Sequence, residues 1–73
     1  MVTLYSKPNC PKCMASKRDL DKLEIAYTYI DVSKDFDAYT YLKSRGILSM
    51  PFVEADDEEW TGYRPDKIKA LAA

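Results

Sequence analysis

The sequence predicts one small α/β domain in which a four-stranded mixed sheet is flanked by three helices, in the order βαβαββα. An alternating strand pattern near the start is followed by a helix and then by a β-branched segment, which is typical of a parallel β-α-β unit. Two short apolar segments near the end are separated only by a tight turn, which favours an antiparallel hairpin. The length of 73 residues leaves room for a single domain, residues 1–73, with one modest core.

Each element of the first half has a local signal. Residues 2–6, "VTLYS", alternate apolar and polar side chains and predict the first strand. The first helix is expected to begin at Pro11, because the N–H that proline lacks is not needed at the first helical position. Residues 25–32, "IAYTYIDV", are β-branched and aromatic and predict the second strand.

The elements of the second half follow in the same way. A helix is expected over residues 35–45, and Gly46 stands where a left-handed residue ends such a helix. Residues 50–53 predict a short strand with a proline at its entrance, and residues 58–63 predict its hairpin partner. The two adjacent aspartates between these strands are expected to form the turn, although they lack the glycine that favours tight turns.

The last helix is expected to begin at Pro65, again with proline at its first position. Hydrophobic residues make up 47% and charged residues 32% of the chain, a balance typical of globular domains. The apolar side chains that recur at helical spacing are therefore assigned to the core. They are Leu20, Leu23, Phe36, Tyr39, Ile68 and Leu71.

The charge pattern argues against several classes of partner. Eleven basic and twelve acidic residues give a net charge of −1, so the chain has no electrostatic footprint for nucleic acid. No segment approaches the ~20 apolar residues of a membrane span, and the start does not resemble a signal peptide, so we expect a cytoplasmic protein. Residues 1–22 carry five bases and two acids, whereas residues 54–59 carry five acids, interpreted as a solvated face.

The motif "CPKC" holds both cysteines of the chain and admits several interpretations. A structural zinc ion needs four ligands, and one chain without histidine supplies only two, so a metal site requires a dimer. A structural disulfide across so short a loop restricts the unfolded chain very little. Two inert buried cysteines are the plainest alternative, but that reading leaves their position at a helix start beside lysines unexplained.

A redox role explains this position. If Pro11 is the first helical residue, Cys10 occupies the N-cap, where its sulfur faces unpaired backbone N–H groups. The helix dipole and the charges of Lys7 and Lys12 also favour the thiolate over the thiol. Cys10 is then the attacking thiolate, and Cys13, one turn into the helix on its apolar side, is the thiol that resolves the mixed disulfide.

The C-x-x-C motif between a first strand and a first helix resembles the thioredoxin fold. Within it, the chain resembles the NrdH-redoxins, small glutaredoxin-like proteins that behave like thioredoxin. Three stretches carry the resemblance: "CPKC", "MPFVEAD" and "WTGYRPDKIKAL". The last is the most specific, because the family has a W-S-G-F-R-P-like segment where glutathione-dependent glutaredoxins have a glycine pair.

The resemblance implies a nucleophile at Cys10, a resolving thiol at Cys13 and a cis bond between Met50 and Pro51. From the residues alone, an ordinary trans proline at a strand edge remains the alternative. A cis bond would expose the backbone of Met50 to a substrate segment that pairs as an added strand. The resemblance further implies a monomer without cofactor or metal that is reduced by thioredoxin reductase. The expected recipient is a class Ib ribonucleotide reductase or another disulfide protein.

The residues that replace the glycine pair are expected to shape the surface where glutathione would otherwise bind. They are Trp60, Thr61, Gly62, Tyr63, Arg64 and Pro65. Core packing against the last helix is an equal alternative for the two aromatic residues. The arginine is expected to meet a partner's carboxylate or one of the acids at 54–59.

Two departures from the family pattern bear on partner choice. Pro11 and Lys12 stand between the cysteines where the family usually has Val-Gln or Met-Gln, and Thr61 and Tyr63 replace serine and phenylalanine. A glutathione-dependent glutaredoxin therefore stays open as an alternative enzyme. An iron-sulfur or zinc module shared by two chains stays open as a binding protein.

Overall fold

The computed structural model describes all residues, 1–73, and has the predicted order of elements. The elements are β1 (Thr3–Ser6), α1 (Pro11–Lys22), β2 (Thr28–Asp31), α2 (Phe36–Ser44), β3 (Phe52–Glu54), β4 (Glu59–Thr61) and α3 (Pro65–Leu71). The strands form one sheet in the order β2-β1-β3-β4. Because β1 pairs in parallel with β2 and antiparallel with β3, and β3 pairs antiparallel with β4, the sheet is mixed, as predicted.

All four strands are shorter than the sequence predicted, and β4 covers only residues 59–61 of the predicted 58–63. Residues 25–32 were expected to be extended, but β2 begins at Thr28. The backbone N–H of Ile25 instead donates to the carbonyl of Leu20 at 3.0 Å and closes the end of α1. In the same way β3 begins at Phe52 and not at residue 50, because Pro51 has no N–H with which to join a sheet ladder.

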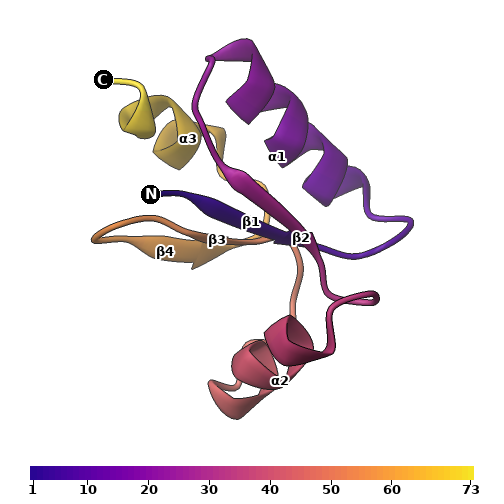
Figure 1. Ribbon diagram of the computed structural model, residues 1–73. Coiled ribbons are helices and arrows are strands. Elements are labelled where there is room, and N and C mark those ends of the chain that lie inside the picture. Colours follow the sequence, from indigo (N-terminus) through magenta and orange to yellow (C-terminus); the bar gives the residue numbers. More distant parts are fainter.

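The two faces of the sheet carry separate apolar clusters, and helices cover both faces (Figure 1). Leu4, Val53 and Trp60 are neighbours in register and face α1 and α3, where Leu20 and Ile68 pack on them. The other face is covered by α2 alone and has a smaller cluster. Its buried members are Tyr5, Ala38, Leu42 and Phe52. Since full burial of one such aliphatic side chain stabilises by ~1.5–3 kcal/mol, the first face supplies most of the core energy.

Three of the residues assigned to the core are exposed, so that part of the prediction was wrong. Phe36 is 78% exposed and Tyr39 is 45% exposed, because α2 buries only Ala38 and Leu42, which are four positions apart. Leu23 is 38% exposed because it lies beyond the last turn of α1, at its C-cap. Phe36 and Tyr39 do recur at helical spacing, but they lie on the exposed side of α2.

The acidic run at 54–59 does more than form a solvated face. Its carboxylates bind cations from two helices: Glu58 pairs with Lys67 of α3, while Glu54 and Glu59 both pair with Arg45 at the end of α2. The hairpin of β3 and β4 is therefore tied electrostatically to helices on both faces of the sheet. None of the three helices has the length and apolar character needed to cross a membrane.

The two helix ends that need a left-handed residue use different amino acids. Gly46 follows α2 with a φ of 75°, as predicted, whereas Glu24 follows α1 with a φ of 57°. A residue with a Cβ in the left-handed region destabilises the folded state by ~1–2 kcal/mol through steric strain. Part of this is offset, because such a residue loses less backbone entropy on folding than glycine does.

Replacing Glu24 with glycine is expected to stabilise the fold by about 0.5–1 kcal/mol, because the strain exceeds the added entropy cost. Gly46→Ala is the matched opposite change and should destabilise by about 1 kcal/mol. Urea unfolding of the oxidised protein measures both. A loss of stability in Glu24→Gly would contradict this account of the α1 terminus.

Candidate active site

The cysteine pair lies at the start of α1, just after the loop that follows β1. Cys10 is the N-cap of α1, with φ −122° and ψ 97°, and its sulfur accepts a hydrogen bond from the backbone N–H of Cys13 at 3.2 Å. The two cysteines form a disulfide, and their Cα atoms are 5.2 Å apart. The predicted N-cap position of Cys10 is thus confirmed. The sulfur takes the place of the oxygen that usually caps a helix.

The two sulfurs differ in their access to solvent. Cys13 is fully buried, whereas Cys10 is 8% exposed and lines an open hollow beside α1. The hollow is bounded by the loop before α1, by the first two turns of α1 and by the end of β2; its residues are Lys7, Pro8, Asn9, Cys10, Pro11, Met14, Tyr29 and Asp31. Only Cys10 is therefore placed to meet an incoming disulfide.

The charged groups near Cys10 are two lysines, Lys7 and Lys12, and one acid, Asp31, which lines the same hollow. Neither Lys7 nor Lys12 forms an ion pair with a carboxylate, and the first turn of α1 contains no acidic residue. Lys7 lines the hollow at Cys10, and Pro11 and Lys12 are exposed at the helix start. The two ammonium groups and the positive end of the helix dipole favour a thiolate at Cys10 when the disulfide is reduced, whereas the carboxylate of Asp31 opposes it.

The segment before β3 completes the site from the opposite side. The bond between Met50 and Pro51 is cis, and the carbonyl oxygen of Met50 lies 3.9 Å from the sulfur of Cys10. Pro51 is buried, and its carbonyl accepts a hydrogen bond from the N–H of Gly62 at 2.8 Å. The cysteines, the proline and the loop after β4 are thus connected within one small region.

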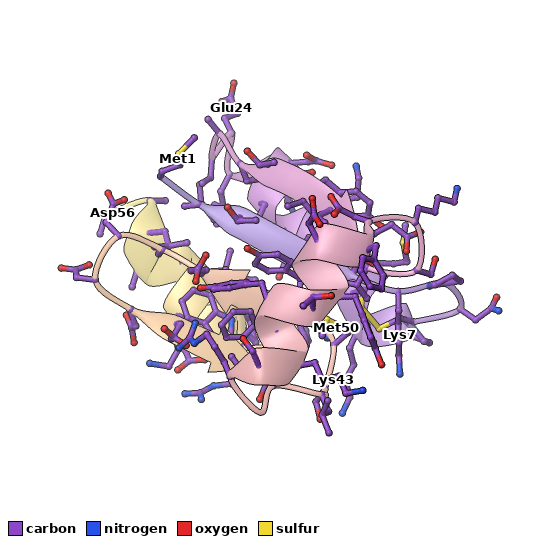
Figure 2. The ribbon with its side chains drawn as sticks, turned by 60° about the horizontal axis from the view of Figure 1, so that its bottom comes forward. Met1, Lys7, Glu24, Lys43, Met50 and Asp56 are labelled. Carbon is purple, nitrogen blue, oxygen red and sulfur yellow. A yellow bond between two sulfur atoms is a disulfide. The ribbon has the colours of Figure 1, made fainter.

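An apolar groove of about 190 Å³ lies next to this region, between α2 and the segment before β3. We call it the α2 groove; its residues are Lys7, Val32, Tyr39, Leu42, Lys43, Ile47, Leu48 and Met50. Lys7, Lys43 and Met50 lie on one side of the molecule (Figure 2). Of the eight residues, only Lys7 and Met50 were predicted to belong to the site. The other six could have been suspected from Leu48, an apolar residue that follows Gly46 in a segment without regular secondary structure.

The residues from Trp60 in β4 to Pro65 at the start of α3 divide into buried and exposed ones. Trp60 is only 6% exposed and packs in the larger core cluster, as the alternative of core packing predicted, with its indole N–H unpaired. Arg64 pairs with Asp66 at 2.9 Å and not with any acid of the run at 54–59. Thr61 and Pro65 are exposed beside the half-buried Gly62.

Tyr63 ties this segment to the helix of the cysteines. Its hydroxyl donates to Asp19 at 2.5 Å, and Arg18 donates to Tyr63 at 3.5 Å. The hydrogen bond from Tyr63, followed by the contact with Arg18, holds the pKa of Asp19 below its usual value. The same bond and partial burial raise the pKa of Tyr63. The hydroxyl of Tyr63, which the phenylalanine usual in the family lacks, therefore forms a hydrogen bond inside this chain.

No cluster of three or more histidine, cysteine or acidic side chains could hold a metal ion. Within one chain, the chemistry of the site is that of two sulfurs. One is capped by the start of a helix, and the other is buried behind it. This arrangement suits an exchange between a dithiol and a disulfide.

Comparison with known proteins agrees with this chemistry. Residues 2–60 match the glutaredoxin family. The chain is 34% identical to the glutaredoxin-like protein NrdH of Salmonella typhimurium over 96% of this chain and 86% of that protein. It is 33% identical to NrdH of Lactococcus lactis over 99% of this chain and the whole of that protein.

A solved structure shows the same fold. The chain superimposes on NrdH-redoxin from Escherichia coli with a TM-score of 0.89 and 33% identity, covering 96% of this chain and 92% of that one. The thioredoxin fold expected from the motif is confirmed by this match. The chain belongs to the glutaredoxin family and, within it, to the NrdH-like thiol-disulfide oxidoreductases, which work through a cysteine pair.

Proposed function

We propose that this chain is a dithiol electron donor that reduces disulfides in other proteins. Thioredoxin reductase is the proposed source of its electrons, and a class Ib ribonucleotide reductase or another disulfide protein is the proposed recipient. The observation that carries the proposal is the position of Cys10: it caps α1 and lines an open hollow that includes Lys7, and it is 8% exposed while Cys13 is fully buried. The E. coli relative, described as having a thioredoxin-like activity profile, supports it.

The geometry suggests two exchange steps. The Cys10 thiolate attacks one sulfur of the substrate disulfide, the substrate S–S bond breaks, and its other sulfur leaves as a thiolate that takes a proton from water. Cys13 then loses its proton and attacks the Cys10 sulfur, which breaks the bond between Cys10 and the substrate. Two electrons pass to the substrate, which leaves as a dithiol, and the chain keeps a disulfide that the reductase reduces again. We propose that this cycle runs in the cytoplasm and needs no cofactor or metal.

The loop after β4 supports thioredoxin reductase over glutathione as the electron source. The chain has no adjacent glycines, and the N–H of Gly62 donates a hydrogen bond to the carbonyl of Pro51. Tyr63 fixes the next residue to Asp19. A loop pinned at both points has little freedom to open a site for a tripeptide.

The single-cysteine variants separate the two proposed roles. Cys10→Ser should abolish insulin reduction, because no accessible thiolate remains. Cys13→Ser should retain the first attack and accumulate a mixed disulfide of the chain with insulin, visible by mass spectrometry under non-reducing conditions. Full activity in both variants would contradict the assignment.

The electron source is tested by insulin reduction with NADPH, once with thioredoxin reductase and once with glutathione plus glutathione reductase. Turnover is expected only with thioredoxin reductase, because the loop after β4 lacks adjacent glycines and is held by the contacts of Gly62 and Tyr63. Turnover only with glutathione would identify a glutathione-dependent glutaredoxin. A chain that purifies as a coloured or zinc-containing dimer would favour the shared metal module.

Tyr63→Phe removes the hydroxyl that donates to Asp19 and keeps the ring. Because the folded-state pKa of Asp19 is lowered, the stability that it contributes is present above the unfolded-state value of ~3.9 and is lost as the pH falls through the folded-state value. The variant should be less stable than wild type near neutral pH, with a difference that shrinks below about pH 4. Urea unfolding across this range measures it. A difference that is independent of pH would refute the role of the Asp19 carboxylate.

A further inference from the structure

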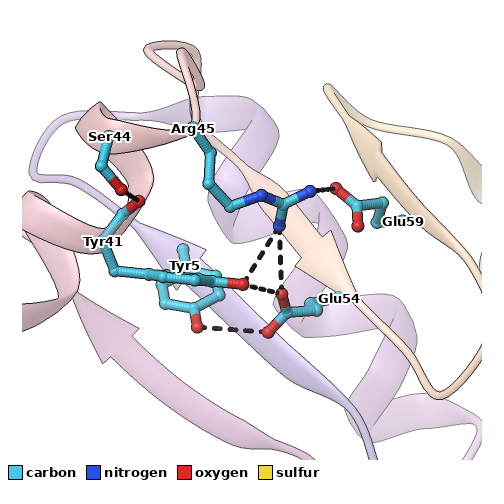
Figure 3. A network of polar contacts seen from close by, with 6 residues as sticks. All are labelled: Tyr5, Tyr41, Ser44, Arg45, Glu54 and Glu59. Atoms are coloured by element: carbon cyan, nitrogen blue, oxygen red, sulfur yellow. Dashed lines mark hydrogen bonds and ion pairs between the residues drawn. The ribbon is translucent and has the colours of Figure 1, made fainter.

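The residue at the end of α2 makes contacts that the exchange chemistry alone does not explain. Arg45 donates to Glu59 at 2.6 Å, to the hydroxyl of Tyr41 at 3.1 Å and to Glu54 at 3.4 Å (Figure 3). Its guanidinium also lies over the rings of Tyr41 and Phe52, at 5.6 and 5.9 Å from the ring centres. One side chain at a helix end therefore contacts the helix itself, β3 and β4.

The carboxylate of Glu54 is shared within this cluster. Its two oxygens accept from the hydroxyls of Tyr41 at 2.5 Å and Tyr5 at 3.4 Å, while one of them also meets Arg45 (Figure 3). Burial and the neighbouring Glu54 raise the pKa of Tyr5 to about 12, so this hydroxyl stays a donor at neutral pH. The cluster of Tyr5, Tyr41, Arg45, Glu54 and Glu59 is thus a connected polar network.

This network matters because α2 is otherwise weakly attached. Only Ala38 and Leu42 of its nine residues are buried, and no second helix covers the same face of the sheet. Fixing a helix with so little buried apolar surface depends more than usual on its polar contacts. Arg45 supplies these contacts at the end of α2 from which the chain leads to the active site.

The segment between Arg45 and β3 carries residues to the cysteines. It runs from Gly46 to Pro51 and includes Met50, whose carbonyl lies 3.9 Å from the Cys10 sulfur. The side chain of Arg45 reaches from the start of this segment to Phe52 and Glu54 just after its end. Arg45 therefore closes the base of the loop that places Met50 beside Cys10.

The α2 groove depends on the same elements. Six of the eight residues that line it lie in α2 or in the segment that follows it. They are Tyr39, Leu42, Lys43, Ile47, Leu48 and Met50. A shift of α2 would change the groove and the position of Met50 together, while leaving the cysteines on α1 in place.

We propose that Arg45 is a positioning residue for the reduction of protein disulfides: by binding Glu54 and Glu59 it holds α2 and residues 46–51 in the arrangement that receives a protein substrate beside Cys10. The role concerns the docking of the substrate and not the exchange between sulfurs. It rests on the proposed reduction of protein disulfides, which the wild-type protein tests first. A wild type that does not reduce insulin contradicts the proposed function and not the geometry of Arg45.

The test uses the pre-reduced full chain and measures the single-turnover rate against insulin concentration, so that no reductase takes part. Arg45→Ala should raise the insulin concentration for half-maximal rate by about fivefold, roughly the effect of 1 kcal/mol, with a limiting rate within about twofold of wild type. Its rate with bis(2-hydroxyethyl) disulfide, which is too small to use the groove, should be unchanged. Arg45→Lys keeps the charge but lacks the planar guanidinium, whose rigid fork of donors meets Glu54 and Glu59 at once, so its half-maximal insulin concentration should lie between those of wild type and Arg45→Ala.

Lys67→Ala is the matched control, because Lys67 pairs with Glu58 and lies over the Trp60 ring at 5.9 Å but contacts neither α2 nor residues 46–51. It should behave as wild type with both substrates. The proposal is overturned if Arg45→Ala matches Lys67→Ala with insulin, or if its rates with the two disulfides fall equally. If circular dichroism shows that Arg45→Ala does not fold, the test uses Arg45→Lys and Glu59→Gln instead. The proposal is overturned if the insulin concentration for half-maximal rate is unchanged in both variants.

Discussion

The active site depends on one hydrogen bond, from the backbone N–H of Cys13 to the sulfur of Cys10. A helix start has N–H groups without partners inside the helix, and here a sulfur occupies the position of the cap. That single contact fixes the order of the two thiols. The capped sulfur lines an open hollow at the helix start, where a negative charge is favoured, and the other sulfur belongs to the first turn and is fully buried.

The sheet sorts its side chains so that this helix start is held firmly. Leu4, Val53 and Trp60 line up across three strands and anchor α1 and α3, and the larger of the two apolar clusters lies on this face. The opposite face holds α2 with a smaller cluster and with the polar network at Arg45. One side of the active site is thus built on the better packed half of the molecule, and the other side on the less packed half.

Local patterns were sufficient to predict the order of the elements, the N-cap role of Cys10 and the position of Pro51 at the entrance of β3. These features depend on neighbours within a few residues. The exposure of Phe36 and the ion pairs of Arg45 could not be predicted, because they depend on which face of α2 meets the sheet. Helical spacing alone gives a stripe but does not say which of two stripes is covered.

The ion pairs of the hairpin have a consequence for how the chain responds to its medium. Arg45 and Lys67 reach Glu54, Glu58 and Glu59 at the edge of the sheet away from β2, and all of these groups are partly open to water. Dissolved ions screen such pairs over ~8 Å at physiological ionic strength and over less as salt is added. The capped sulfur at the start of α1 is bound by a buried hydrogen bond instead. A change in salinity therefore acts on the ion pairs of the hairpin and leaves the capping hydrogen bond of Cys10 in place.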